Sequence, residues 1–193
     1  MHARLEEIAE KLNLEEMMVI TMVHDHQMRR RSYELLAKAA GLGFNIDAEE
    51  ADRLALSLEV IEATLSDPAL KGWDGFGVVV QAYGRRAGAV IDWLHALAAR
   101  LDRKIMVRLV KGAYWDAEIK RAQELGLPYY PVFTHKHHTD VSYLACARAL
   151  LDARDVIYPQ FATHNAGTIA AILQMGSRQA VPFELQRLHG MGE

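Results

Sequence analysis

Phe76-Gly-Val-Val-Val-Gln81 and Ile105-Met-Val-Arg-Leu-Val110 are the two stretches of this sequence that decide its fold. The first is apolar almost throughout, which is typical of a strand buried on both faces of a parallel sheet. The second resembles it, and between the two stretches apolar residues recur at helical spacing from Val90 to Leu101. A strand, a helix and a strand in this order predict a βαβ unit with a right-handed crossover. We therefore expect an α/β protein with a parallel sheet.

The same alternation continues on both sides of this unit. Further strands are predicted at residues 43–47, 156–161 and 183–188. Helices are predicted at residues 51–65, at 115–125, from a cap at Thr139 or Asp140 to about Asp152, and at 168–175.

Polar side chains stand at or near the end of each predicted strand: Asp47, Gln81, Arg108, His164 and Gln186. In (βα) barrels, functional groups gather at the carboxyl ends of several strands, whereas an open doubly wound sheet binds at one switch point and usually has a Gly-rich first turn. The sequence has no G-x-G-x-x-G, so we favour a TIM-type (βα)8 barrel over the open sheet. Its 193 residues fall short of the ~250 that a whole barrel needs, so we expect an incomplete barrel with about five of eight strands.

Residues 1–31 do not continue the alternation. Apolar positions between residues 5 and 12 make one helical face, and the apolar run 17–23 fits a strand or a buried helix. We treat 1–31 as a helical segment without an assigned role and 32–193 as the partial barrel. The run 17–23 is far shorter than the ~20 residues of a membrane span, and no secretory signal precedes it, so the expected location is the cytoplasm.

The charge of the chain bears on its partners, and its cysteine content bears on disulfides and on the redox compartment. The chain has 22 Lys and Arg against 25 Asp and Glu, a net charge of -3. There is no basic excess to neutralise phosphates, so we expect no nucleic-acid partner. The single cysteine, Cys146, excludes an intrachain disulfide and fits a reducing compartment. Small and apolar neighbours on a helix indicate that Cys146 packs in the core and is not a nucleophile.

The segment Arg108-Leu-Val-Lys-Gly-Ala-Tyr-Trp115 places two cations around a strand end, followed by a glycine. One interpretation is a site where the backbone at Gly112 approaches an anion or an electron-rich cofactor and Arg108 supplies a fixed positive charge. The alternative is a salt-bridged barrel mouth with Trp115 in the core. The pattern alone leaves both open.

Two other motifs also allow a plain and a functional interpretation. Phe161-Ala-Thr-His-Asn165 supplies donors suited to a phosphate or ribityl chain, or else forms a hydrogen-bonded turn. His135-Lys-His-His138 and His24-Asp-His26 contain the residue type that metals prefer, but neither has the ligand count of a strong metal signature. We predict no metal site, and a metal-dependent barrel hydrolase stays an alternative.

Longer motifs resemble the proline dehydrogenase domain of the proline utilization A (PutA) family, from about residue 32 to residue 193. They are Asn45-Ile-Asp-Ala-Glu-Glu-Ala-Asp52, Val80-Gln-Ala-Tyr83, Arg108-Leu-Val-Lys-Gly-Ala-Tyr-Trp-Asp116, Thr139-Asp-Val-Ser-Tyr-Leu-Ala-Cys-Ala147, Ile157-Tyr-Pro-Gln-Phe-Ala-Thr-His-Asn165 and Phe183-Glu-Leu-Gln-Arg-Leu-His-Gly-Met-Gly-Glu193. The resemblance implies a distorted (βα) barrel that holds FAD at its carboxyl-terminal face. It also implies oxidation of L-proline to Δ1-pyrroline-5-carboxylate, with electrons passed to a quinone.

By position, the resemblance also assigns residues. Those implied to hold or border FAD are Gln81, Arg108, Val110, Gly112, Ala113, Trp115, Thr134, Lys136, Thr139, Thr163, His164, Asn165, Gln186 and Leu188. Those implied to act on proline are Asp47, Tyr114 and Leu188, together with Arg108 near the flavin N5. This placement of Arg108 agrees with chemistry, because the electron density that a flavin gains near N5 and N1 needs a cation or a donor beside it.

The sequence also departs from the family pattern. We expect it to lack the first two barrel strands, with a lysine for the substrate carboxylate, and the last strand and helix, with an arginine pair. His135 stands where the family usually has arginine, which weakens the expected contact on the adenine side. A flavin-binding chain without turnover is therefore an alternative to the enzyme. A peripheral membrane contact and a homo-oligomer are left open.

Overall fold

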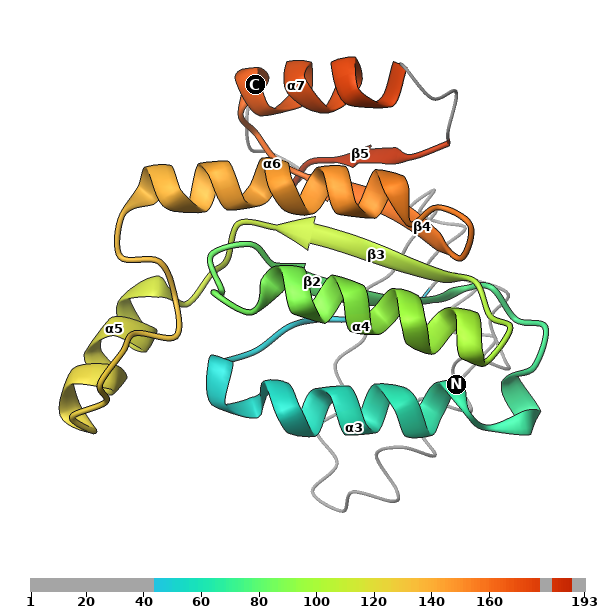
Figure 1. Ribbon diagram of the computed structural model, residues 1–193, viewed down its shortest axis with the longest axis horizontal. Helices are drawn as coiled ribbons and strands as arrows, with labels where there is room; N and C mark the ends of the chain where they lie inside the picture. Colours follow the sequence, from blue (N-terminus) through green and yellow to red (C-terminus); the bar gives the residue numbers. More distant parts are fainter. Residues whose placement is uncertain (1–43, 178–181, 189–193) are drawn as a thin grey trace, which may run out of the picture.

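The computed structural model describes residues 44–177 and 182–188. Their strands form one parallel sheet paired in the order of the sequence (Figure 1). The strands are β1 (Phe44–Ile46), β2 (Phe76–Gln81), β3 (Ile105–Val110), β4 (Ile157–Ala162) and β5 (Glu184–Gln186). This confirms the predicted α/β class and the parallel order, and the five strands are consistent with the predicted incomplete barrel. Within the described ranges no ladder joins β1 to β5, so this part of the chain does not close a barrel.

The longer helices cover one face of the sheet, which we call the helix face. Figure 1 shows α3, α4 and α6 running along the strands, whereas α5 projects beyond the end at which the strands finish. The helices are α3 (Leu54–Leu65), α4 (Ala87–Arg100), α5 (Trp115–Glu124), α6 (Lys136–Asp152) and α7 (Ala166–Ser177), with short 3-10 turns η1 (Ala51–Arg53) and η2 (Pro68–Leu70).

The core lies between the sheet and these helices. Alternate residues of the central strands, such as Val107 and Leu109 of β3, point to the helix face and are fully buried. They pack in one cluster with Leu94 of α4 and Leu150 of α6. Burying each such side chain contributes about 1.5–3 kcal/mol relative to leaving it exposed, so this layer is the main source of stability in the described part.

Cys146 lies on the inner side of α6 and is 4% exposed. Burial raises the pKa of its thiol, which keeps the sulfur protonated and inert. The prediction that Cys146 is a packing residue is confirmed.

The opposite face of the sheet, which we call the site face, carries polar side chains. Arg108 of β3 pairs with Val79 of β2 on one side and with Gln160 of β4 on the other, and Gln160 pairs with Glu184 of β5. Paired residues of a parallel sheet point to the same face, so these side chains form one row, the arginine row. The sheet thus turns an apolar face to the helices and a polar one to the site.

Two helix starts differ from the prediction. Helix α6 begins at Lys136 with His135 as its N-cap residue, so the predicted cap at Thr139 or Asp140 is wrong. Both residues lie inside the helix because Lys136 and Asp140, four residues apart, pair along its first turns. Helix α7 begins at Ala166, two residues earlier than predicted.

The predictions for residues 1–31, including the apolar run 17–23 and His24-Asp-His26, lie outside the described residues. Among residues 44–177 and 182–188, no helix is both long and apolar enough to cross a membrane.

Candidate active site

The carboxyl ends of the strands bring together the polar residues that the sequence singled out. Two residues further along each strand than the arginine row, Gln81 of β2 pairs with Val110 of β3, and Ala162 of β4 pairs with Gln186 of β5. Alternation by two residues puts this second row, the rim row, on the site face as well. Residues far apart in the sequence thus meet at one edge of the sheet.

Arg108 is the fixed positive charge of this edge. Its side chain is only 14% exposed, and its Nε donates a hydrogen bond of 2.6 Å to Oε1 of Gln186. A terminal guanidinium nitrogen, Nη1, lies 3.8 Å from the Asp47 carboxylate, which follows β1. The guanidinium is therefore held in place by a neutral partner and a charged one.

Gln81 ties two loops of the site together. Its Nε2 donates to the carbonyl oxygen of Glu49 at 2.8 Å, and its Oε1 accepts from the backbone N–H of Ala113 at 3.2 Å. The first loop carries Asp47, and the second follows β3. Both the NH2 group and the carbonyl oxygen of this amide are used, so the relative position of the two loops is fixed at this point.

Gly112 lies close to an aromatic ring, and its predicted approach to an anion or a cofactor stays a prediction. Its φ is +132°, and a Cβ at this position would lie 2.5 Å from the ring of Tyr83. No side chain fits there without displacing a ring that is itself buried. The glycine therefore lets the chain cross Tyr83 and turn toward α5.

A cavity of about 700 Å³ opens beside this turn, within the range of ~300–1,000 Å³ usual for small-molecule sites. It is lined by Tyr83, Lys111, Gly112, Ala113, Tyr114, Trp115, Asp116, Ala117, Thr134, Lys136 and Thr139. Trp115 is 41% exposed and its Nε1 donates to the carbonyl oxygen of Phe133 at 2.8 Å. The alternative that placed Trp115 in the core is therefore wrong, and its ring forms part of the cavity wall.

Two lysines on the cavity wall share one carboxylate. Nζ of Lys111 lies 2.5 Å from Oδ1 of Asp140, and Nζ of Lys136 lies 2.8 Å from Oδ2. These hydrogen bonds, from Lys111 first and Lys136 second, hold the pKa of Asp140 below its usual value. The carboxylate stays ionised and keeps two ammonium groups together at the cavity, an arrangement suited to an anionic ligand.

The end of β4 forms a hydrogen-bonded turn. Oγ1 of Thr163 accepts from the N–H of Asn165 at 3.2 Å, and Oδ1 of Asn165 accepts from the N–H of Thr168 at 2.8 Å. Asn165 therefore caps α7, which explains the early start of that helix. The ring of His164 is exposed between them. The plainer interpretation of this motif is realised, and its contact with a cofactor stays a prediction.

The residues predicted to face proline lie around the same edge. The Asp47 side chain is 48% exposed, Tyr114 is 37% exposed and Leu188 is 63% exposed. They follow β1, β3 and β5, respectively. All three are accessible to a small molecule, and their roles stay predictions.

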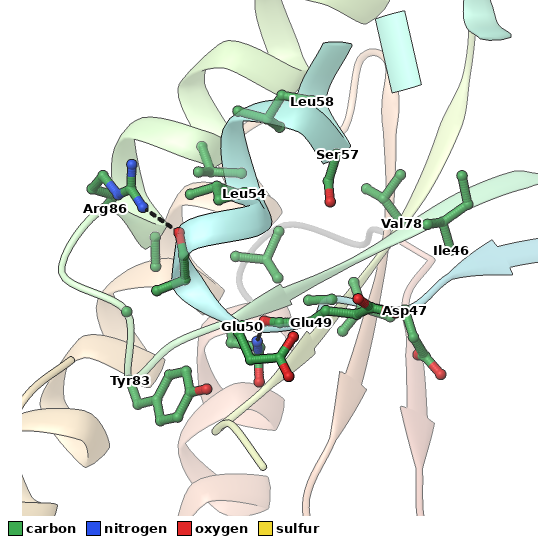
Figure 2. A pocket seen from close by; sticks show the side chains of 18 of the residues that line it. Ile46, Asp47, Glu49, Glu50, Leu54, Ser57, Leu58, Val78, Tyr83 and Arg86 are labelled. Carbon is green, nitrogen blue, oxygen red and sulfur yellow. Dashed lines mark hydrogen bonds between the residues drawn. The ribbon is translucent and has the colours of Figure 1, made fainter. Parts of the chain in front are cut away.

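A narrower cavity of about 80 Å³ lies between α3, the first two strands and α4. Figure 2 shows Leu54, Ser57, Leu58 and Val78 around it, with Asp47 at one end. Most of its lining consists of apolar side chains that belong to the layer between sheet and helices. Its polar lining, which includes Asp47 and Gln81, lies at the end near the strand termini, and its volume is too small for a cofactor, so we assign the ligand site to the larger cavity.

The predicted histidine cluster is present as a stack at the start of α6. The rings of His135 and His137 stack with centroids 5.4 Å apart, and His138 lies edge-on to both, at 5.4 and 4.4 Å. Within the described ranges, no group of three or more His, Cys, Asp or Glu side chains is arranged to hold a metal ion.

Sequence reasoning missed some residues of this edge. Lys111 was noted only as a charge, Asp140 only as a possible helix cap, and Glu184 was assigned no role. The spacing of four between Lys136 and Asp140 is a visible helical signal. The contacts of Lys111 with Asp140 and of Glu184 with Gln160 join separate elements, so no local pattern could have found them.

Together, the parallel sheet, the polar edge and the cavity define an α/β protein of the barrel type with a ligand site at the carboxyl ends of its strands. Its sequence matches the profile of the family described as "Proline dehydrogenase" over residues 2–193. The chain belongs to the proline dehydrogenase family.

Individual relatives agree with this family. Over 167 residues, the chain is 58% identical to "Bifunctional protein PutA" of Klebsiella aerogenes and 57% identical to that of Escherichia coli. Each match covers 86% of this chain and 13% of the relative, so the chain spans about an eighth of these proteins.

Solved structures support the fold. A crystal structure of Bradyrhizobium japonicum PutA, the D779Y mutant, superposes with a TM-score of 0.81 at 62% identity, covering 85% of this chain and 17% of that one. The structure of Bdellovibrio bacteriovorus PutA, described as inactivated by N-propargylglycine, has a TM-score of 0.81 at 35% identity. It covers 86% of this chain and 17% of that one.

Proposed function

We propose that this chain binds FAD at the carboxyl ends of its strands and oxidises L-proline to Δ1-pyrroline-5-carboxylate. The observation that carries the proposal is the anchored guanidinium of Arg108, set one row below Gln81 and Gln186 and 3.8 Å from Asp47. A flavin ring over the rim row would meet a fixed cation where its electron density rises on reduction. The family membership makes proline the natural substrate to test.

The donor set of the larger cavity fits the rest of FAD. Lys111 and Lys136 offer two ammonium groups for a diphosphate, and the hydroxyls of Thr134 and Thr139 add neutral donors. The cavity of about 700 Å³ has room for a nucleotide. Trp115 gives it an aromatic wall. These residues would hold the phosphates and the adenosine, while the rim row would border the flavin ring.

Bound FAD supplies the two-electron acceptor, and the residues of this chain bind and orient the substrate. The half-exposed carboxylate of Asp47 can accept a hydrogen bond from the amine of a cyclic amino acid. Tyr114 and Leu188 offer apolar surface to the methylene groups of such a ring. Arg108 keeps its charge fixed through Gln186, so little reorganisation is needed when charge develops.

The first experiment is a titration of the purified chain with FAD, followed by reduction of an artificial electron-accepting dye on addition of L-proline. We expect flavin uptake and proline-dependent dye reduction that N-propargylglycine, named for the Bdellovibrio relative, inactivates. A colourless protein that takes up no FAD would contradict the proposal. FAD uptake without any proline-dependent reduction would instead support the alternative of a flavin-binding chain without turnover.

Arg108→Met tests the residue that carries the proposal. We expect it to lower the rate of flavin reduction by proline by about 100-fold or more, because a preorganised charge is lost. The matched control is Arg100→Met, since Arg100 ends α4 with its side chain 58% exposed and pairs with Glu62. If Arg108→Met reduced flavin as fast as the control, Arg108 would not be the catalytic cation.

We also propose an electron acceptor and a location for this chain. Electrons pass on to a quinone, and the chain works in the cytoplasm, in line with the family resemblance. The described residues provide no three-ligand metal cluster that would favour a barrel hydrolase.

A further inference from the structure

Glu184, on β5, accepts a hydrogen bond from Gln186, the residue whose amide holds the Arg108 side chain. Its Oε1 accepts a hydrogen bond of 2.7 Å from Nε2 of Gln186, and its Oε2 accepts one of 3.1 Å from Nε2 of Gln160. Gln186 in turn accepts from Nε of Arg108 at 2.6 Å. A chain of hydrogen bonds thus runs from a carboxylate to the guanidinium through one amide.

The carboxylate decides which way this amide points. The two ends of a glutamine amide have nearly the same shape, so the partners fix its orientation. An ionised carboxylate only accepts hydrogen bonds, so Gln186 must turn its NH2 group toward Glu184. Its carbonyl oxygen then faces Arg108, which only donates. Rotated by 180°, the same amide would set donor against donor at the guanidinium.

The amide of Gln160 is also oriented with its NH2 group toward the Glu184 carboxylate, even at a cost. It is 3% exposed, and its Oε1 has no hydrogen-bond partner among the described residues, while its Nε2 is held by Glu184. A buried carbonyl without a partner is costly. The amide nevertheless keeps this orientation, as expected when its NH2 group makes a charge-assisted bond.

We propose that Glu184 is a positioning residue for the proline oxidation: by orienting the Gln186 amide, it fixes the guanidinium of Arg108 at the place where the flavin ring is expected. The inference rests on the proposed function for its catalytic consequence. Its structural part, the control of Arg108 by Glu184, concerns only residues of this chain.

The proposal predicts opposite results for two substitutions of one residue. Glu184→Met removes the carboxylate that accepts from Nε2 of Gln186, so the amide is held less firmly and its hydrogen bond to Arg108 is weakened. In Glu184→Gln, the carbonyl oxygen of the new side chain can still accept a hydrogen bond from Gln186. The NH2 group of the new side chain can donate to Oε1 of Gln160 once the Gln160 amide rotates by 180°. This rotation costs little, because Oε1 of Gln160 has no hydrogen-bond partner among the described residues to lose. The neutral, isosteric variant should therefore preserve the position of Arg108.

The first readout is the Nε–H signal of Arg108 in 15N-edited NMR spectra of the FAD-free chain, assigned by its loss in Arg108→Lys. We expect Glu184→Met to shift this signal and speed its exchange with water at least about fivefold, as for one lost hydrogen bond. Glu184→Gln and the control Glu59→Met, at an exposed site on α3, should leave it in place.

The second readout is proline-dependent reduction of the FAD-loaded chain. We expect a loss of about tenfold to 100-fold for Glu184→Met, as for a slightly misplaced catalytic group, and near wild-type rates for Glu184→Gln. An unchanged Nε–H signal in Glu184→Met, or an equal loss in Glu184→Gln, would overturn the proposal. If the chain took up no FAD, the proposed function would fail, whereas the NMR comparison would still decide whether Glu184 positions Arg108.

Discussion

Gly112 is the single residue at which the shape of the cavity depends most directly on the backbone. We predict that Gly112→Ala destabilises the fold by about 2 kcal/mol or more, because φ of +132° strains the alanine and its Cβ would meet the Tyr83 ring at 2.5 Å. Tyr83 is 4% exposed and has little room to move. Urea unfolding measures the loss, and FAD titration should show weaker binding.

The control is the same substitution at a glycine without these constraints. Gly88 lies in the first turn of α4, and a Cβ there would meet no atom within 4 Å. Gly88→Ala should leave stability unchanged or raise it by up to about 1 kcal/mol, since alanine favours the helix. Equal losses at both glycines would mean that the contact with Tyr83 is not the cause.

At the scale of the element, α7 depends on its cap. Oδ1 of Asn165 accepts from both the N–H and the Oγ1 of Thr168, at 2.8 and 3.1 Å. We predict that Asn165→Ala lowers the free energy of unfolding by about 1 kcal/mol and that Asn165→Ser restores most of it, because serine also caps helices. Thermal unfolding of the two variants checks this. A similar loss in both would point to a role of the amide other than capping.

The elements also show what the sequence could predict. Strands such as β2 and β3 were predicted at their observed bounds, since an apolar strand buried in a parallel sheet is a local signal. The start of α6 was not predicted. A threonine or aspartate is usually the cap, but here Asp140 pairs with two lysines, one of them from another loop. The spacing of Lys136 and Asp140 is a local signal that the prediction did not use, whereas the contact with Lys111 leaves no local pattern.

In the molecule as a whole, the positions of the candidate site residues could be predicted from the sequence, whereas the partners that orient them could not. The positions of Gln81, Arg108 and Gln186 followed from the rule that strand ends meet at one edge, together with the family resemblance. The partners that orient them did not follow from it. Glu184 and Gln186 lie two residues apart on one strand, but whether Glu184 also reaches Gln160, and Gln186 reaches Arg108, depends on side-chain distances between strands that the sequence alone does not show.

The loop between β1 and α3 joins distant parts of the molecule at Ala51. Its N–H donates to Oε1 of Glu118 on α5 at 2.6 Å, and its carbonyl oxygen accepts from Nη2 of Arg86 at 2.8 Å. The hydrogen bond from Arg86 is the dashed line beside that residue in Figure 2. Glu118 is 4% exposed, so this acceptor is not readily replaced by water. The loop that presents Asp47 to the site is therefore held in place by a helix that follows β3.

We predict that Glu118→Ala releases this loop. The N–H of Ala51 would lose its acceptor in a poorly hydrated place, at a cost of about 1–3 kcal/mol, and its exchange with deuterium should become markedly faster. Hydrogen–deuterium exchange measures this directly, and the proposed enzyme should need more proline for half-maximal rate, because Asp47 is less well placed. The control is Glu124→Ala in the same helix, where the side chain is 62% exposed and lies 3.7 Å from Nζ of Lys120. If Ala51 exchanged at the same rate in both variants, α5 would not be what holds the loop, and Gln81 and Arg86 alone would have to keep Asp47 in place.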